Sequence, residues 1–299
     1  MNPLIKREFV GILRTRQAFA ALVVLSIAFS VLVLARWPTD ARVDLSGSQP
    51  QQVFRVFAYS LLAGVVLLVP AFPAVSIIRE KNKGTLALLI NSPLKSWSIY
   101  LGKLGGVFLF TLFLIMTSLP AAAACYAMGG IELVKGFGLL YAVLLMLAVQ
   151  YSTLGLLVSS AVQSVDGGVR VTYAIAFAMS FLSLGPSYVY QGTAGLLTTV
   201  AQWLRYLSPI PIIMDIVGHG DVGRQGLLTT DSGVPQFFLL SVLTSLAFAV
   251  ATISRLNYRI FDRSRDQGVI TQERSLAGRS FRRFLFLVDP QRRKTGIPW

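Results

Sequence analysis

The sequence predicts an all-α integral membrane protein: six transmembrane helices, an N-terminal amphipathic helix at the membrane interface, and short re-entrant helices at the outer face. Three observations lead to this prediction. Hydrophobic residues make up 54% of the 299 residues and charged residues only 13%, whereas a soluble domain carries about 25% charged residues. Apolar runs of the length that a helix needs to cross a bilayer recur along the chain. Lys and Arg are concentrated in alternate connecting segments, as in a multi-pass protein.

Six apolar runs are long enough to span the hydrocarbon core, which takes about 20 helical residues. None of them contains Asp, Glu, Lys, Arg or His. They are Ala18–Ala35, Val56–Ile78, Leu104–Met128, Gly136–Val162, Val171–Tyr190 and Gln236–Ser254. Prolines within the second and third runs (Pro70, Pro73 and Pro120) predict kinks, because proline lacks the amide hydrogen that a helix uses.

The N-terminal segment, residues 1–17, is predicted to be an amphipathic helix in the cytoplasmic interface. Its apolar residues fall near one helical face and its basic residues elsewhere, which is typical of a helix lying on a membrane. The apolar residues are Leu4, Ile5, Phe9, Ile12 and Leu13. The run that follows is longer than the apolar region of a typical signal peptide. We therefore interpret it as a retained first span, with a cleaved signal as the alternative.

The distribution of basic residues predicts the orientation. In a six-span topology, one side of the membrane carries 21 of the 27 Lys and Arg residues, whereas the 13 acidic residues are divided almost evenly, seven against six. The basic side holds both termini, so the positive-inside rule places both in the cytoplasm. We expect a transmembrane domain over residues 18–254 and a basic cytoplasmic tail over 255–299, which contacts anionic lipid.

The segment Gln191–Pro235 is formally an outer loop, but its apolar residues recur at helical spacing. Pro209 and Pro211 interrupt this pattern, and the chain becomes apolar again over Ile212–Val217. Backbone can enter the membrane without crossing it where other parts of the protein cover it. We therefore expect one or two short re-entrant or interfacial helices at the outer face.

Several kinds of chemistry have no support in the sequence. The net charge of +14 comes from residues outside the apolar runs, so we expect a lipid surface and no nucleic acid as the partner of these charges. With one cysteine, Cys125, and one histidine, His219, the chain offers neither a disulfide framework nor a metal centre. It also lacks the phosphate-binding motif G-x-x-x-x-G-K-[ST]. We predict no catalytic, metal or cofactor site in this chain.

The most informative segment connects the second and third spans. Residues 78–104 read IREKNKGTLALLINSPLKSWSIYLGKL. After the charged residues, Gly84 permits a tight turn, Thr85 can cap a short helix, and Asn91-Ser92-Pro93 ends it. The segment thus predicts a short, partly apolar helix parallel to the membrane, and an exposed apolar surface of this kind fits a protein partner.

This segment resembles the loop of the ABC-2 type transporter permeases, which runs approximately E-x-x-x-G-T-L-E-x-L-L-x-x-P before a basic residue that opens the next span. The family's second Glu is replaced by Ala87. The basic position is Lys103. The other matching residues, which the resemblance implies couple the permease to an ATPase, are Glu80, Gly84, Thr85, Leu86, Leu88, Leu89 and Pro93.

The resemblance implies a membrane-spanning permease subunit of an ATP-binding cassette exporter in the plasma membrane of a bacterium. A separate cytoplasmic ABC-type ATPase dimer would bind ATP and Mg²⁺ and act through the loop 79–95. A second permease subunit, identical or related, would complete the transporter. The alternatives are a secondary transporter or channel without an ATPase, and a structural membrane protein. Ion-coupled transporters usually carry ionisable residues within their spans, and the six apolar runs have none.

Overall fold

The computed structural model describes residues 3–35, 48–82, 96–128, 131–190, 195–218 and 233–266. These residues form helices and no strand. In chain order the helices are α1 (Pro3–Leu13), α2 (Arg16–Ala35), α3 (Ser48–Leu68), α4 (Ala71–Asn82), α6 (Ser96–Ala127), the π-helix η1 (Leu133–Gly138), α7 (Leu139–Ala161), α8 (Val165–Ser180), the 3-10 helix η2 (Leu182–Leu184), α9 (Gly185–Val189), α10 (Leu196–Arg205), α11 (Pro209–Ile216) and α13 (Val234–Asp266).

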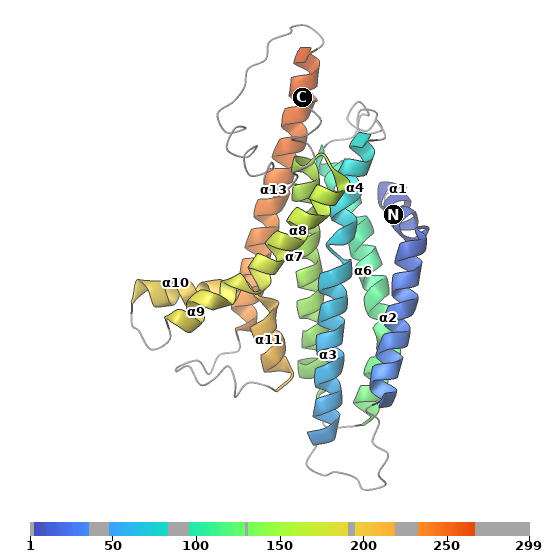
Figure 1. Cartoon of the computed structure of the whole chain (residues 1–299), viewed down its shortest axis with the longest axis vertical. Coiled ribbons are helices and arrows are strands. Elements are labelled where there is room, and N and C mark those ends of the chain that lie inside the picture. The colour runs from blue at the N-terminus through green and yellow to red at the C-terminus, as the bar shows by residue number, and fades with distance from the viewer. Residues whose placement is uncertain are drawn as a thin grey trace, which may run out of the picture.

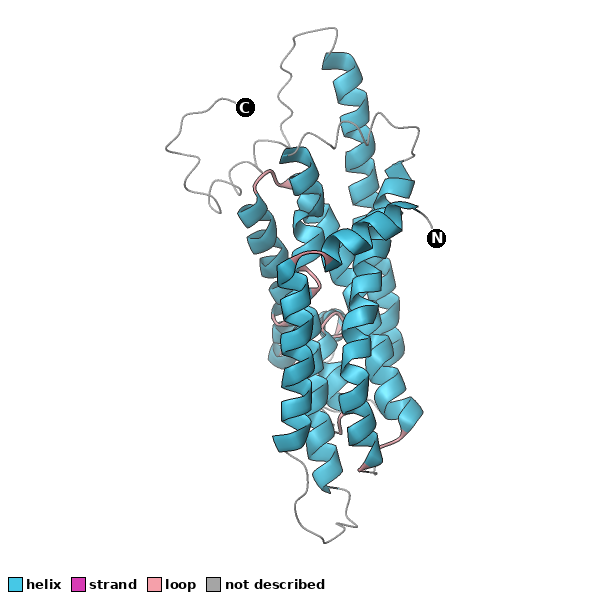
Figure 2. Ribbon diagram, turned by 90° about the vertical axis from the view of Figure 1, so that its right-hand side faces the viewer, coloured by secondary structure: helices cyan, strands magenta, loops and turns pink. Residues whose placement is uncertain are grey.

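Among the residues that the structure describes, six helical segments are long and apolar enough to cross a membrane, as the sequence predicts. They form an elongated bundle (Figures 1 and 2), and they cover Ala18–Ala35, Gln51–Asn82, Ser96–Ala127, Leu133–Ala161, Val165–Val189 and Val234–Leu256. Most of them run roughly along its long axis, whereas α8 runs obliquely in Figure 1. Several segments extend beyond the apolar runs. In particular, α6 begins at Ser96 and therefore includes Lys103, which the sequence places just before the third span.

The second span consists of two helices. α3 ends at Leu68 and α4 begins at Ala71, so the break falls at Pro70, where a kink is expected. Neither Pro70 nor Pro73 has an amide hydrogen, and these positions cannot donate to the carbonyls one turn earlier. By contrast, α6 continues through Pro120. The part of the span that leads into the loop is therefore a separate short helix.

The fifth span is also interrupted, which the sequence does not predict. α8 ends at Ser180 and is followed by η2 and α9. Pro186 follows the break, and proline is poorly accommodated within a continuing helix. In Figure 1, α9 and α10 extend sideways from the bundle, and α11 lies back against it. The outward face of α10 is apolar; its exposed residues include Leu196, Leu197, Val200, Trp203 and Leu204.

α10 and α11 lie within the segment where short outer helices are expected; their depth in the membrane stays a prediction. The two prolines at the start of α11 do not interrupt a helix but begin one. Ser208 caps it by accepting a hydrogen bond from the amide of Ile210 (3.3 Å), and Pro209 occupies the first helical position, where its missing amide hydrogen costs nothing. Arg55 of α3 donates to the carbonyl oxygens of Val217 and Gly218, each at 3.2 Å.

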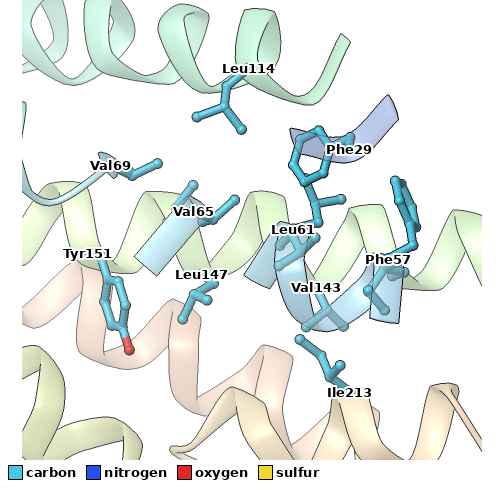
Figure 3. Packing of buried hydrophobic residues seen from close by; sticks show 14 of the residues in the cluster. Phe29, Phe57, Leu61, Val65, Val69, Leu114, Val143, Leu147, Tyr151 and Ile213 are labelled. Atoms are coloured by element: carbon cyan, nitrogen blue, oxygen red, sulfur yellow. The ribbon is translucent and has the colours of Figure 1, made fainter. Parts of the chain in front are cut away.

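The core forms around α7, which lies at the centre of the bundle. Side chains from α2, α3, α6, α7 and α11 meet there (Figure 3), and those with almost no exposed surface include Phe29, Phe57, Leu61, Leu114, Val143, Leu147, Tyr151 and Ile213. The ring of Phe57 lies edge to face with that of Phe29, with centroids 5.9 Å apart. Such aromatic pairs add to the stabilisation that burial provides.

α1 packs along α6 at the end of the bundle where α4 ends and α6 begins, called here the α4–α6 end. Its predicted apolar face is turned toward the bundle: Phe9, Ile12 and Leu13 pack against the core, and the rings of Phe9 and Phe113 lie 6.5 Å apart. Its place relative to the membrane interface stays a prediction. These contacts explain the sequence pattern by packing against protein.

Candidate functional site: the helix ends around the loop 79–95

The predicted coupling residues are divided between the described and the undescribed parts of the chain. Glu80 lies in the last turn of α4. The remaining six lie outside the described residues, so their predicted roles rest on the sequence; they are Gly84, Thr85, Leu86, Leu88, Leu89 and Pro93. The structure does describe the two helices that enter and leave this loop.

A buried ion pair joins these two helices. The Nζ atom of Lys103, on α6, lies 2.9 Å from Oε1 of Glu80, on α4, and it also donates to Oγ of Ser76 at 3.0 Å. The side chain of Lys103 is only 4% exposed and that of Glu80 14%. Since an unpaired buried charge is costly, this pair favours one arrangement of the two helix ends that flank the loop.

α1 contributes a second carboxylate to the same lysine. Oε1 of Glu8 lies 3.4 Å from Nζ of Lys103. Arg7 lies 3.0 Å from Glu8 and 3.5 Å from Glu80. Two glycines of α6 permit this approach. A Cβ atom at Gly106 would lie 2.7 Å from Cβ of Glu8, and one at Gly105 would lie 3.1 Å from the side chain of Ile5.

Arg7, Glu8, Glu80 and Lys103 form what we call the charge cluster. Two cations and two carboxylates balance within it, and it links α1, α4 and α6. Coulomb interactions are stronger at the low effective dielectric of a buried site than at the surface. The low dielectric applies to the Lys103–Glu80 pair, because the side chain of Arg7 is 56% exposed. The cluster joins three helices at the α4–α6 end.

A neighbouring lysine, Lys81, joins α4 to α7. Nζ of Lys81 donates to the carbonyl oxygens of Ser159, Ser160 and Val162, at 3.1, 2.9 and 3.3 Å. These carbonyls belong to the C-terminal end of α7, where a helix leaves its last acceptors without backbone partners. A cation there also complements the helix dipole. Glu80 and Lys81 together join the end of α4 to three helices, α1, α6 and α7.

Deeper in the bundle, polar side chains join helices without forming an ionic site. Nε2 of Gln150, on α7, donates to Oγ1 of Thr244 at 2.9 Å, and Oγ of Ser241 donates to its Oε1 at 3.3 Å; both partners lie on α13. The hydroxyls of Tyr151 and Ser180 join α7 to α8. Within the described ranges, no three His, Cys, Asp or Glu residues group as metal ligands.

Sequence reasoning identifies Glu80 and Lys103 through the loop motif but does not identify Arg7 and Glu8 as their partners. It also does not predict that Lys81 binds the end of α7. The only available signal for Glu8 is that one acidic residue stands among the basic residues of the first helix. Nothing in the sequence pairs α1 with α6, because the contact joins residues 95 positions apart. The three-sided fastening of α4 emerges only in the folded chain.

Comparison with known proteins agrees with this arrangement. The family model described as ABC-2 family transporter protein matches residues 17–254, which include five of the candidate spans, all but the last two residues of the sixth, and the loop between α4 and α6. A search of curated proteins gave no match. The match covers most of the chain and confirms the resemblance that the loop motif carries. The chain belongs to the ABC-2 family of transporter proteins and is a multi-pass membrane permease of an ABC transporter.

Proposed function

We propose that this permease is an exporter subunit driven by a separate cytoplasmic ABC-type ATPase dimer, which binds ATP and Mg²⁺ and acts on the loop 79–95. Both termini lie in the cytoplasm of a bacterial cell, and a second permease subunit completes the transporter in the inner membrane. The chain itself hydrolyses no ATP. Substrate binding and ATP hydrolysis are coupled because each shifts a shared conformational equilibrium.

The observation that carries this proposal is the fastening of α4. The helix that enters the loop is joined to α6 through Lys103, to α1 through Arg7, and to α7 through Lys81. A displacement of the loop would therefore act on α1, α6 and α7 as well as on α4, and the core is built around α7. Rigid-body movement of packed helices is a common form of such transitions.

Co-expression tests the partnership. The chain is purified together with a cytoplasmic ABC-type ATPase from the same genome, and vanadate-sensitive ATP hydrolysis is measured with and without the permease. We expect a stable complex in which the permease changes the rate of hydrolysis. Failure to co-purify with any such ATPase, or an unchanged rate, contradicts the proposal. Transport into proteoliposomes driven by an ion gradient alone would instead support a secondary transporter.

The direction of transport is tested in cells. Small molecules and lipids are compared by mass spectrometry between a strain that lacks the gene and one in which it is restored. An exported compound accumulates inside the deletion strain and returns to its normal level on restoration. A compound that is depleted in the deletion strain shows import and contradicts this part of the proposal.

A further inference from the structure

α4 and α7 run in the same direction and contact each other once per turn. Gly155 of α7 lies against Pro73 and Ala74. One turn further on, Ser159 meets Ile77 and Ile78. The carbonyls at the end of α7 then meet Lys81. The contacts stay in register because both helices advance by the same rise per residue.

The contact at Ser159 is made to the backbone of α4. The buried Oγ atom of Ser159 accepts hydrogen bonds from the amides of Ile77 (3.0 Å) and Ile78 (3.2 Å). In a regular α-helix these amides donate to the carbonyls four residues earlier, those of Pro73 and Ala74. A side-chain oxygen that enters this ladder joins the two helices directly and is a recognised cause of helix bending.

Glycines bring the helix backbones close enough for this contact. A Cβ atom at Gly155 would lie 3.0 Å from the backbone nitrogen of Ala74. α8 approaches the same residue: a Cβ atom at Gly168 would lie 2.9 Å from the carbonyl oxygen of Ala74. Small residues at such positions allow close packing of membrane helices. Ala74 of α4 is thus in close contact with both α7 and α8.

α4 and α3 are joined by fewer backbone hydrogen bonds than a continuous helix would have. The helix is broken between Leu68 and Ala71, and Pro70 cannot supply a backbone donor across the break. The carbonyl of Leu67 accepts a hydrogen bond from the hydroxyl of Tyr173 on α8. Backbone hydrogen bonding along the second span is therefore interrupted where a helix can bend with the fewest bonds lost.

We infer that α4 moves with α7 as one body and turns relative to α3 about residues 69–70. Ser159 and Lys81 are the positioning residues of this unit, since they join α7 to the backbone and to the end of α4. The inference rests on the proposed function, because it assigns the displacement of the loop to α7 and not to α3. Force applied at the loop then reaches the centre of the bundle.

The first test needs no ATPase. Hydrogen exchange at the amides of Ile77 and Ile78 is measured in the purified full-length chain in lipid nanodiscs. Loss of a hydrogen bond of ordinary strength predicts roughly 2- to 10-fold faster exchange in Ser159→Ala. Ser160→Ala is the matched control, because the hydroxyl of Ser160 donates to Leu157 within its own helix. Unchanged exchange in Ser159→Ala overturns the inference.

The second test measures movement in the complex with the ATPase. Spin labels are introduced in a Cys125→Ala background as two pairs, Asn82→Cys with Ala161→Cys and Asn82→Cys with Ala63→Cys. Between the ATP-free and vanadate-trapped states, the α4–α7 distance should stay constant and the α3–α4 distance should change. The reverse result overturns the inference. If neither distance responds to trapping, the proposed function fails, while the exchange measurement still decides how α4 and α7 are joined.

Discussion

The residue with the greatest electrostatic consequence is Lys103. It is almost fully buried and lies within 3.4 Å of both Glu8 and Glu80. Lys103→Met would leave two carboxylates near each other without this cation. Removing one partner of a buried ion pair typically costs about 3 kcal/mol or more. We expect a clear fall in the unfolding temperature of the purified protein in detergent.

Two further variants check that the loss comes from the two carboxylates beside Lys103. Lys103→Met combined with Glu80→Gln should recover part of the stability, because the second change removes one of the two carboxylates that Arg7 would otherwise have to balance. Lys135→Met is the surface control: its pair with Glu132 (3.3 Å) has side chains that are 82% and 67% exposed, and such pairs contribute little. If Lys103→Met and Lys135→Met lowered the unfolding temperature equally, the charge cluster would contribute no more to stability than an exposed ion pair.

The glycines that seat α4 give a prediction based on space. In Gly155→Ala the new methyl group would meet the ring of Pro73 and the backbone nitrogen of Ala74, both on α4. Overpacking of this kind costs about 1–3 kcal/mol. Gly11→Ala in α1 meets nothing within 4 Å, so it should be neutral or stabilising, since alanine favours a helix more than glycine does. Thermal unfolding of both variants checks this, and an equally stable Gly155→Ala would mean that α4 can shift away from α7.

At this scale the sequence identifies residues whose motif is local and fails where the partner is distant. Glu80 and Lys103 can be selected from the loop pattern. The hydrogen bonds that Ser159 accepts from α4 cannot be predicted, because a serine in a helix commonly bonds to the backbone of its own helix. Its bond to α4 depends on the close approach that Gly155, on its own helix, and Gly168, on α8, allow.

At the scale of the elements, the loop 79–95 connects the proposed partner to α4 and α6. Leu86 and Leu89 lie three residues apart and would share one face of its predicted helix. Leu86→Asp with Leu89→Asp places charge in an apolar contact, at a cost of several kcal/mol. We expect the double variant to enter the membrane normally and to lose the ATPase in co-purification.

A matched control adds the same charge elsewhere on the predicted cytoplasmic side. Phe281→Asp with Phe284→Asp changes two apolar residues at the same spacing in the tail, and the complex should survive. If instead the leucine variant keeps the ATPase, the leucine face contacts the permease itself, and α1 becomes the next surface to examine.

The elements themselves could be predicted to different extents. The break in the second span follows from Pro70, because a missing donor acts locally. The end of α8 at Ser180 does not follow from its apolar sequence, which continues across it. The outward apolar face of α10 is ambiguous in the sequence for a related reason: in a membrane protein, an apolar face can be turned toward lipid as well as toward the core.

The whole molecule has a predicted orientation that rests on its basic residues. In a Cys125→Ala background, cysteines replacing Ser48 and Ser232 should react with a membrane-impermeant thiol reagent added to intact cells. A cysteine replacing Ser275 should react only after the membrane is permeabilised. Labelling of Ser275→Cys in intact cells would reverse the assigned orientation and with it the side from which an ATPase can reach the loop 79–95.

Six spans could be predicted from composition and run length, because crossing a bilayer imposes the same length on every helix. The arrangement of those spans could not, since lipid-facing and protein-facing residues are equally apolar. Hence the central place of α7 is visible only in the structure. The polar contacts of Gln150 with α13 and of Lys81 with α4 then show which neighbours it joins.

α1 can dock on α6 only after α6 has been synthesised. Glu8 is made 95 residues before Lys103, and bacterial and eukaryotic ribosomes add about 5–20 residues per second. For roughly 5–20 s after α1 is made, its glycine-lined seat on α6 and the cation beside Glu8 do not yet exist. During this interval the first two spans are synthesised while α1 has no α6 to dock on. An amphipathic face that later packs on protein can rest on the membrane surface meanwhile, so the same pattern serves both the nascent and the finished chain.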